Sequence, residues 1–281
     1  MACIQIAQRV QSSVTTWPLL GVEALSKSFG RIAAITNLTF TIDEGQVVGL
    51  IGPICSGRST ILDLLTGTIK PTFGRITVAG EDVTQLGPEL RVRRGLVCGP
   101  QPANLFLDLT AYENVLLGGG ISHPPFFSRR GGRTSRDEAM AMLEFTGLAG
   151  VSNVRAADLS PCEQRFLTIA VALATKPLLL LLDGLAVGIS KAERSALASL
   201  IADIRDNGTS VLIAEQVMSP LTDVCDRILV LSSGKIIADD VPLRIGRNAT
   251  VSDADLSCSQ LSGSCLIANR VPGLPRAHRE S

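Results

Sequence analysis

The sequence predicts an α/β fold whose core is a mainly parallel sheet. Three short runs are apolar almost throughout: QVVGLI at 46–51, LLLLLD at 178–183 and SVLIAE at 210–215. Runs of this kind are typical of strands that helices cover on both faces, as in parallel sheets. Helical stretches alternate with the runs, and 281 residues suffice for one large α/β domain or two smaller ones.

Further strand-like runs complete the predicted sheets: LTFTI (38–42), RITVAG (75–80), GLVCG (95–99) and RILVLSSGKIIAD (227–239). Between about 107 and 165 no strong strand pattern occurs, and residues 131–149 are patterned as an amphipathic helix. We therefore expect a helical insertion between strands of the sheet over 107–165.

The ends of the chain differ in pattern from its middle. The regular alternation begins near Leu19, and from Arg247 the composition turns to Ser, Asn, Asp and Pro. Such polar segments lack the apolar residues needed to bury a core. We expect a flexible leader at 1–17, an ordered domain at 18–246 and a disordered tail at 247–281.

Composition excludes several classes of protein. The 26 basic residues balance the 26 acidic ones, so nothing favours nucleic acid as a partner. Although 46% of the residues are hydrophobic, no run reaches the roughly 18–20 uncharged apolar residues of a membrane span. The N-terminus lacks a basic flank followed by an apolar core, so no secretion signal is predicted. The seven cysteines are scattered without a CxxC and there are only two histidines, so we expect reduced thiols and no metal site.

The stretch GPICSGRST at 52–60 has the spacing of a phosphate-binding loop, G-x-x-x-x-G-K-[ST], with Arg58 at the lysine position. It follows the strand-like run 46–51, and a helix is expected to begin at Ser59 and Thr60. Backbone N–H groups and the helix N-terminus would then face an anion, whereas the alternative is an ordinary glycine-containing turn. The nucleotide-binding residues predicted here are Gly52, Pro53, Ile54, Cys55, Ser56, Gly57, Arg58, Ser59 and Thr60, with Ser59 also a ligand of Mg²⁺.

From about Val22 to Ile245 the chain resembles the ATPase subunits of ATP-binding cassette (ABC) importers, above all those of the branched-chain amino-acid group. The resemblance is carried by SKSFG (26–30), IDEGQVVGLIGP (42–53), LFLDLTAYENVLLG (105–118) and DRILVLSSGKIIADD (226–240). It implies a P-loop NTPase fold of the ABC type, with an N-terminal antiparallel β part and a helical subdomain. ATP and Mg²⁺ are the implied cofactors.

The resemblance also implies partners and a location. These are membrane permease subunits, a second ABC ATPase subunit in a hetero- or homodimer and, indirectly, a solute-binding protein. The implied location is peripheral, at the cytoplasmic face of the inner (plasma) membrane.

The same resemblance assigns roles to residues outside the loop. Phe29 takes the place of the aromatic residue that stacks on adenine, the alternative being a core residue. Gln101 matches the glutamine that contacts Mg²⁺ and the attacking water and faces the permease. Asp183 would hold Mg²⁺ through water, the alternative being an ordinary acidic residue at a strand end. Ser160 would contact the nucleotide held by the opposite subunit.

Four matched motifs depart from the family pattern, three of them at this chain's own nucleotide site. Arg58 keeps the charge of the lysine but has a wide planar group, so we expect weakened nucleotide binding. Cys55 replaces a glycine, which matters if the position needs a positive φ. Gly184 replaces the glutamate that acts as general base, a contribution of about 10²–10⁴-fold. Gln216 replaces a histidine, and an amide cannot become cationic.

The fourth departure is LSPCE at 159–163, where the family has LSGGQ. Pro161 removes an N–H donor, Cys162 adds bulk and Glu163 places a carboxylate near phosphate oxygens. Ser160 and Glu163 have the spacing of a helix capping box, with proline at the first helical position. We therefore predict that the helix still begins here, while contact with the partner's nucleotide is lost.

Three functions remain open on these residues. The first is an importer ATPase subunit that binds ATP and hydrolyses it slowly. The others are a non-catalytic scaffold subunit and a decayed paralogue. The solute does not follow from the motifs, because other subunits select it; amides, urea and aromatic compounds fit as well as branched-chain amino acids.

Overall fold

The computed structural model describes residues 17–99, 105–122, 135–185, 188, 190–216 and 224–246. The predicted leader, apart from Trp17, and the predicted tail lie outside these residues. Within them the chain forms two sheets with helices on both sides of the larger one, so the predicted α/β class is confirmed.

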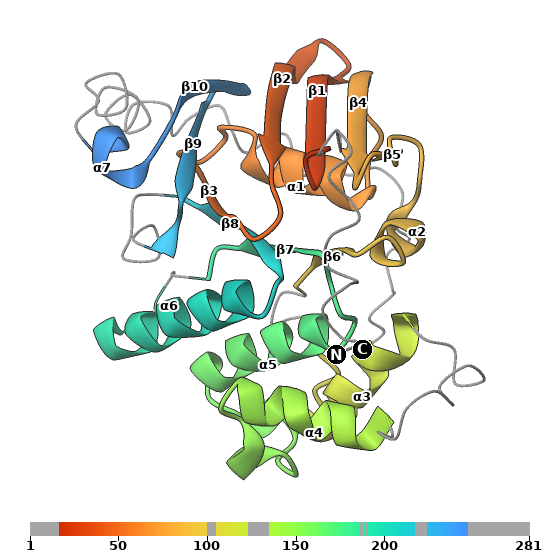
Figure 1. The fold of residues 1–281 in the computed structure, drawn as a ribbon, viewed down its shortest axis with the longest axis vertical. Helices are drawn as coiled ribbons and strands as arrows, with labels where there is room; N and C mark the ends of the chain where they lie inside the picture. The colour runs from red at the N-terminus through yellow and green to blue at the C-terminus, as the bar shows by residue number, and fades with distance from the viewer. Residues whose placement is uncertain are drawn as a thin grey trace, which may run out of the picture.

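The smaller sheet is antiparallel and has the strand order β2-β1-β4-β5 (Figure 1). Its strands are β1 (Leu20–Phe29), β2 (Ile32–Ile42), β4 (Phe73–Val78) and β5 (Glu81–Asp82). β1 pairs antiparallel with both β2 and β4, and its inward side chains are fully buried. This is the antiparallel β part that the family resemblance implied.

The larger sheet has six strands in the order β10-β9-β3-β8-β7-β6. They are β3 (Val47–Ile51), β6 (Leu96–Cys98), β7 (Leu179–Asp183), β8 (Ser210–Glu215), β9 (Arg227–Ser232) and β10 (Lys235–Asp240). All neighbours pair in parallel except β10, which is antiparallel to β9. Every residue of β3 and β8 is buried, as the apolar runs predicted.

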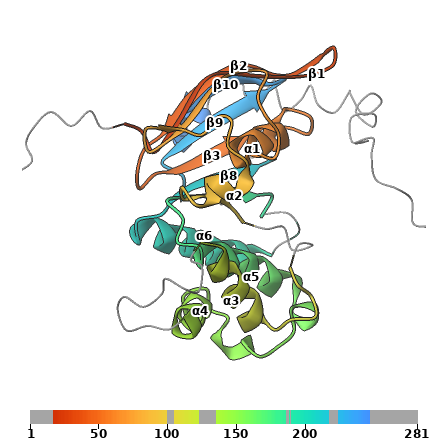
Figure 2. The ribbon, with the colours of Figure 1, turned by 90° about the vertical axis from the view of Figure 1, so that its right-hand side faces the viewer.

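Seven α-helices occur in the described part of the chain. They are α1 (Arg58–Thr66), α2 (Pro88–Val92), α3 (Ala111–Ser122), α4 (Ser135–Phe145), α5 (Pro161–Leu173), α6 (Lys191–Asp206) and α7 (Pro242–Ile245). Figure 2 shows α1 between the two sheets, and α5 and α6 across the other face of the larger sheet. The described helices are too short or too polar to cross a membrane.

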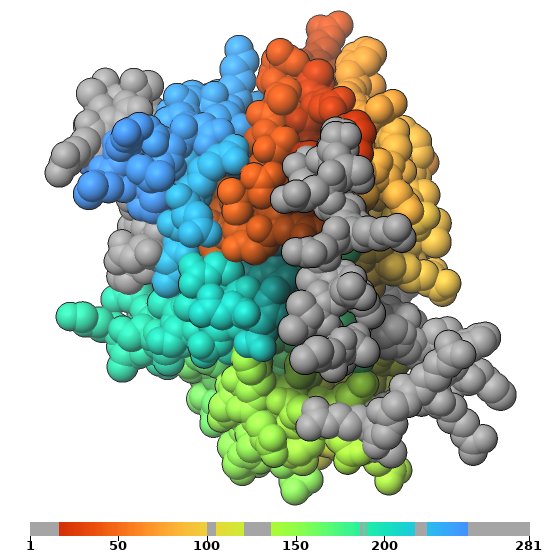
Figure 3. Space-filling model, viewed as in Figure 1, coloured from red at the N-terminus to blue at the C-terminus, as the bar shows by residue number. Residues whose placement is uncertain are grey.

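Three apolar clusters hold these layers together. The first joins both sheets through α1, and the second packs α5 and α6 on the larger sheet. The third lies among α3, α4 and α5, away from the antiparallel sheet, which occupies the opposite end of the molecule (Figure 3). The helical region therefore has a core of its own, attached to the sheet through α5.

Candidate functional site

The loop between β3 and α1 lies at the carboxyl edge of the larger sheet. The Gly52 N–H donates to the Glu215 carbonyl oxygen at 3.2 Å, and the Gly234 N–H donates to the Ser56 carbonyl oxygen at 2.8 Å. A Cβ on Gly52 would lie 2.5 Å from the Leu231 carbonyl oxygen, so only glycine fits there. Backbone contacts with β8 and with the β9–β10 turn thus set the path of the loop.

The loop ends at Gly57, which caps α1 with φ +106° and offers no capping side chain. The first N–H groups of a helix have no partner within the helix and carry partial positive charge. No side chain of the cap residue binds these groups in α1, and an anion is the ligand that such a helix end favours. The predicted helix start at Ser59 is one residue late, because Arg58 already belongs to α1.

Arg58 begins α1, and its Nε is buried without a hydrogen-bond partner among the described residues. Burial lowers the pKa of its guanidinium, and the carboxylates of Asp183 and Glu215 partly oppose this shift. The Ser56 hydroxyl is likewise buried and unpartnered within the described residues. A buried donor without an acceptor is unfavourable, so both groups fit a ligand rich in oxygen acceptors, such as a phosphate.

Cys55 adopts φ +67°, in the left-handed region. This answers the question that the sequence left open: the position does favour glycine, and a side chain there costs about 1–2 kcal/mol. Cys55 also takes part in a disulfide. The expectation of reduced thiols is therefore wrong at this cysteine, and holds for the free Cys98, Cys162 and Cys225.

The acidic residues lie at the same edge as the loop. Asp183 pairs in register with Ala214, and Glu215, the next residue, pairs with Ile51 at the end of β3. Burial raises the pKa of Asp183, and the charge of Arg58 partly offsets this. The pKa of Asp63 in α1 is also raised, first by burial and then by the Asp183 charge. Asp183 and Arg58 thus share a half-buried site, and the exposed Asp63 lies near enough for the Asp183 charge to raise its pKa.

The side chains at this edge of the sheet could bind Mg²⁺ only if a phosphate supplied further ligands. Among the described residues no group of three His, Cys, Asp or Glu side chains could hold a metal ion. Mg²⁺ is commonly held by one or two carboxylates, waters and substrate phosphates, so Asp183 and the exposed Ser59 would suffice beside bound nucleotide. Gln101 lies outside the described residues and adds nothing to this test.

Gly184, at the position expected for a general base, adopts φ +61°. A Cβ on this residue would have no atom of the described residues within 4 Å, so these residues leave space for a side chain. The backbone angle is nevertheless one that suits glycine. Gln216 follows β8 directly and is exposed.

Phe29, the predicted adenine-stacking residue, ends β1 with 49% of its surface exposed. Lys27 Nζ lies 5.1 Å from the centre of its ring, within the range of a cation–π contact. The alternative of a core role is therefore wrong. The exposed face leaves the ring free to stack on a ligand.

The capping box predicted at the start of α5 is confirmed. The Ser160 N–H donates to Glu163 Oε2 at 2.8 Å, and the Glu163 N–H donates to Ser160 Oγ at 3.3 Å. Pro161 occupies the first turn. Because the Glu163 carboxylate already sits at this helix end, α5 is poorly suited to receive a phosphate.

A second capping box, at Ser190 and Glu193, begins α6 and was missed in the sequence. It has the same Ser-x-x-Glu spacing, which would have revealed it. The Cys162 thiol and the Glu193 carboxylate form a hydrogen bond, which joins the starts of α5 and α6. Burial and this bond raise the pKa of Cys162 to about 11, so the thiol stays protonated and unreactive at neutral pH.

The comparison with known protein families shows to which family the chain belongs. Residues 35–186, which contain the loop, Asp183 and the α5 capping box, match the ABC transporter family. The chain belongs to the ABC transporter family. The matched residues include the whole of the loop between β3 and α1.

Curated relatives of this ABC protein cover most of its length. The high-affinity branched-chain amino acid transport ATP-binding protein BraF of Pseudomonas aeruginosa is 34% identical over 250 residues, covering 85% of this chain and 98% of the relative. LivG of Escherichia coli, which has the same descriptive name, is 33% identical over the same span. The lipopolysaccharide export system ATP-binding protein LptB of Haemophilus influenzae is 30% identical over 227 residues, covering 81% of this chain and 92% of the relative.

Solved ABC structures share the fold. An ATP-binding cassette of an ABC transporter in its ADP conformation aligns with a TM-score of 0.77 at 24% identity, covering 86% of this chain and 99% of that one. A dimeric ATP-binding cassette bound to ADP and phosphate aligns with a TM-score of 0.67 at 26% identity, covering 79% and 98%.

Proposed function

We propose that the chain is a nucleotide-binding subunit of an ABC importer that binds ATP on the loop 52–60. The observation that carries this proposal is the pair of buried, unpartnered donors at Arg58 and Ser56, beside the open N-terminus of α1. Phe29 would stack on the adenine ring. The proposed solutes are branched-chain amino acids or similar small molecules, by analogy with the relatives named for that transport.

Hydrolysis by this subunit is proposed to be slow. Gly184 has no side chain to take a proton from the attacking water, and Gln216 cannot become cationic near the γ-phosphate. Asp183, Ser59 and, by family analogy, Gln101 would hold Mg²⁺, which supplies charge neutralisation at the phosphates. The site can thus bind and neutralise ATP while lacking the group that activates water.

The partner ATPase subunit is proposed to depend little on α5 of this chain. In ABC dimers the start of α5 faces the nucleotide of the opposite subunit, and Ser160 would be its contact. Here the Glu163 carboxylate accepts the Ser160 N–H and adds negative charge at that end. Any residual turnover in a mixed dimer would therefore rely on the partner's own loop and base.

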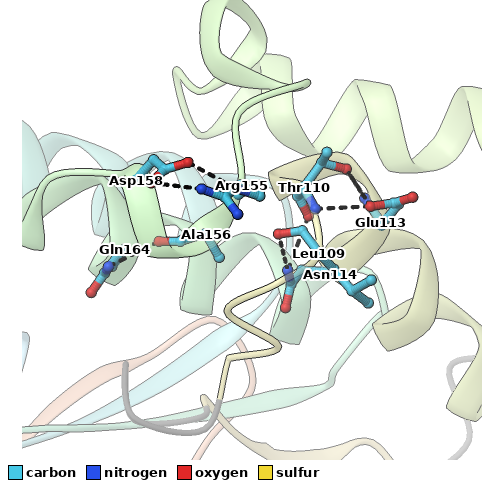
Figure 4. A network of polar contacts seen from close by, with 8 residues as sticks. All are labelled: Leu109, Thr110, Glu113, Asn114, Arg155, Ala156, Asp158 and Gln164. Atoms are coloured by element: carbon cyan, nitrogen blue, oxygen red, sulfur yellow. Dashed lines mark hydrogen bonds and ion pairs between the residues drawn. The ribbon is translucent and has the colours of Figure 1, made fainter.

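The loop that leads into α3 is proposed to dock on a membrane permease subunit, which would place the chain peripherally at the cytoplasmic face of the membrane. Phe106 and Leu107 expose 61% and 45% of their surface there. Asn114 fixes this loop, because its side chain accepts the Phe106 N–H. The same side chain donates to the Leu109 and Thr110 carbonyl oxygens (Figure 4). A solute-binding protein would act through the permease rather than by direct contact.

This docking loop is also tied to α5. The Ala156 N–H donates to the Leu109 carbonyl oxygen at 2.8 Å, and Gln164 Nε2 of α5 donates to the Ala156 carbonyl oxygen at 2.9 Å (Figure 4). A capping box at Thr110 and Glu113 fixes the start of α3. Movement of a docked permease would accordingly reach α5 through a short chain of hydrogen bonds.

Nucleotide titration and steady-state ATP turnover of the purified full-length chain test the proposal. We expect saturable binding of Mg·ATP, and turnover that is low and disappears in Asp183→Asn. Absence of nucleotide binding would contradict the proposal. Binding without any turnover above the Asp183→Asn background would instead favour the non-catalytic scaffold.

A further inference from the structure

Arg91 in α2 is the largest fully buried side chain of the described residues, with 1% of its surface exposed. It forms no ion pair with a carboxylate of the described residues and donates only to backbone carbonyl oxygens. Its Nη1 bonds the carbonyl oxygens of Leu64 and Leu65, at 2.7 Å for Leu65. Its Nε bonds Leu86 at 3.0 Å, and its Nη2 bonds Thr84 at 3.0 Å.

Burying a guanidinium in this way is unfavourable unless its donors are satisfied. Burial lowers the pKa of Arg91 to about 10, with the Asp82 charge opposing the shift, so the group remains cationic at neutral pH. The last carbonyl groups of a helix carry partial negative charge. Leu64 and Leu65 belong to the last turn of α1, which contains no basic residue of its own. Arg91, which lies in α2, supplies the positive charge that complements this end of α1.

A glycine at the end of α1 makes room for the Arg91 side chain. Gly67 ends α1 at φ +80°, and a Cβ there would lie 2.8 Å from Arg91 Nε and 2.6 Å from the Leu86 carbonyl oxygen. A glycine is therefore required both for the backbone angle and for the approach of the guanidinium.

Arg91 holds the carboxyl end of the helix that follows the loop 52–57. The helix whose end it holds begins at the phosphate loop, and α1 is short, with nine residues spanning about 13 Å. At its other end, α1 starts close to β2, because a Cβ on Gly57 would lie 2.7 Å from Ile35 Cδ1 and 3.1 Å from the Ala34 carbonyl oxygen. Beyond Arg91 the chain enters β6, which contacts both α1 and α2.

We infer that Arg91 is a positioning residue that holds α1, and with it the phosphate loop, in the geometry that receives nucleotide. The part of the inference that concerns nucleotide rests on the proposed function. The part that concerns the loop does not, because it can be measured without a ligand.

Hydrogen exchange of the ligand-free full-length chain tests the effect on the loop. In Arg91→Met, which keeps an unbranched apolar stem, we expect amides of 52–66 to exchange at least about tenfold faster than in the natural chain, because α1 opens locally. Amides of β8 should be unchanged. Arg93→Met is the matched control, since Arg93 is an exposed neighbour paired with Glu89 at 2.7 Å, and should change neither segment.

The result that would overturn the inference is equal acceleration of 52–66 and β8 in Arg91→Met, which indicates a merely structural role. Unchanged exchange over 52–66 would overturn it too. Should Arg91→Met fail to fold, Arg91→Lys replaces it. Lysine keeps the charge but cannot reach all four carbonyl oxygens, so we expect a smaller acceleration confined to 52–66.

A nucleotide titration of the same folded variants tests the effect on the site. We expect the Kd for Mg·ATP to rise about tenfold in Arg91→Met, less in Arg91→Lys and not at all in Arg93→Met. An unchanged Kd in folded Arg91→Met would overturn the inference for the nucleotide site. If the natural chain binds no Mg·ATP, the proposed function fails, and the exchange experiment still decides whether Arg91 holds the loop.

Discussion

The Gly184 N–H donates a hydrogen bond to the Ala214 carbonyl oxygen at 2.9 Å, one residue after Asp183 has paired with Ala214 in register. This bond extends the β7–β8 pairing by one step while Gly184 turns into the left-handed region at φ +61°. A Cβ there would have no atom of the described part of the chain within 4 Å. The backbone angle, not lack of space, is therefore what opposes a side chain at the position of the missing general base.

Restoring that base should therefore lower the stability of the fold, even where it raises ATP turnover. We expect Gly184→Glu to reduce the free energy of unfolding by about 1–2 kcal/mol, because glutamate is strained at a positive φ. The double variant Gly184→Glu with Arg58→Lys should raise ATP turnover above that of either single variant. Urea unfolding and steady-state turnover measure the two effects.

Gly184→Asn is the control for the backbone angle, because asparagine tolerates the left-handed region better than glutamate. It should be less destabilising than Gly184→Glu and should not raise turnover. If the double variant stays at the turnover of the natural chain, the loss of these two groups is not the main lesion.

Replacing Arg58 by lysine should strengthen nucleotide binding. The buried Arg58 Nε has no partner among the described residues, and a compact ammonium fits a phosphate loop better than a planar guanidinium. We expect the Kd for Mg·ATP to fall about tenfold in Arg58→Lys, measured by calorimetric titration. Arg93→Lys, at the exposed residue that directly follows α2, should leave the Kd as it is. Equal or weaker binding by Arg58→Lys would contradict the prediction.

Cys55→Gly should stabilise the reduced protein. Cys55 is held at φ +67°, and the relief of about 1–2 kcal/mol is partly offset by about 0.5–1 kcal/mol for the greater freedom of glycine when unfolded. We expect a net gain of about 0.5–1 kcal/mol in urea unfolding with a reducing agent present. Without reductant the gain should shrink or reverse, since the variant cannot form the disulfide.

Cys55→Ala separates the two causes. Alanine removes the thiol but keeps a Cβ at the same φ, so it should bring no gain in the reduced protein. A gain in Cys55→Ala equal to that in Cys55→Gly would show that the thiol, not the backbone angle, is unfavourable.

The α6 capping box should make stability depend on acid pH. Hydrogen bonds from Ser190, first from its side chain and then from its backbone, lower the pKa of Glu193. The charged form therefore favours folding, and its contribution is complete above the unfolded pKa of about 4.3. It is lost as the pH falls through the lower folded pKa. Thermal unfolding across this range should show the loss.

Glu193→Gln removes the titrating group, so its unfolding temperature should fall less steeply below about pH 4.3 than that of the natural chain. The exposed Glu44→Gln is the control and should keep the steeper fall. Parallel acid profiles for Glu193→Gln and the natural chain would contradict the assignment.

Local pattern alone determined much of the fold. Apolar runs predicted the buried strands β3, β7 and β8, and the loop spacing predicted the strand-to-helix turn at 52–60. The Ser160 capping box was predictable because its bonds join residues three apart in the chain. These features depend on neighbours in the sequence, and residue spacing records such neighbours directly.

Tertiary structure decided the rest. Neither the left-handed angles of Cys55 and Gly184 nor the exposure of Phe29 could be derived from residue type, because they depend on how segments distant in the sequence are arranged. Arg91 is one of three arginines in ELRVRRG, and no spacing distinguishes the buried one from its exposed neighbour Arg93. Its partners Leu64 and Leu65 lie 27 and 26 residues away, and only folding brings their carbonyl groups to it.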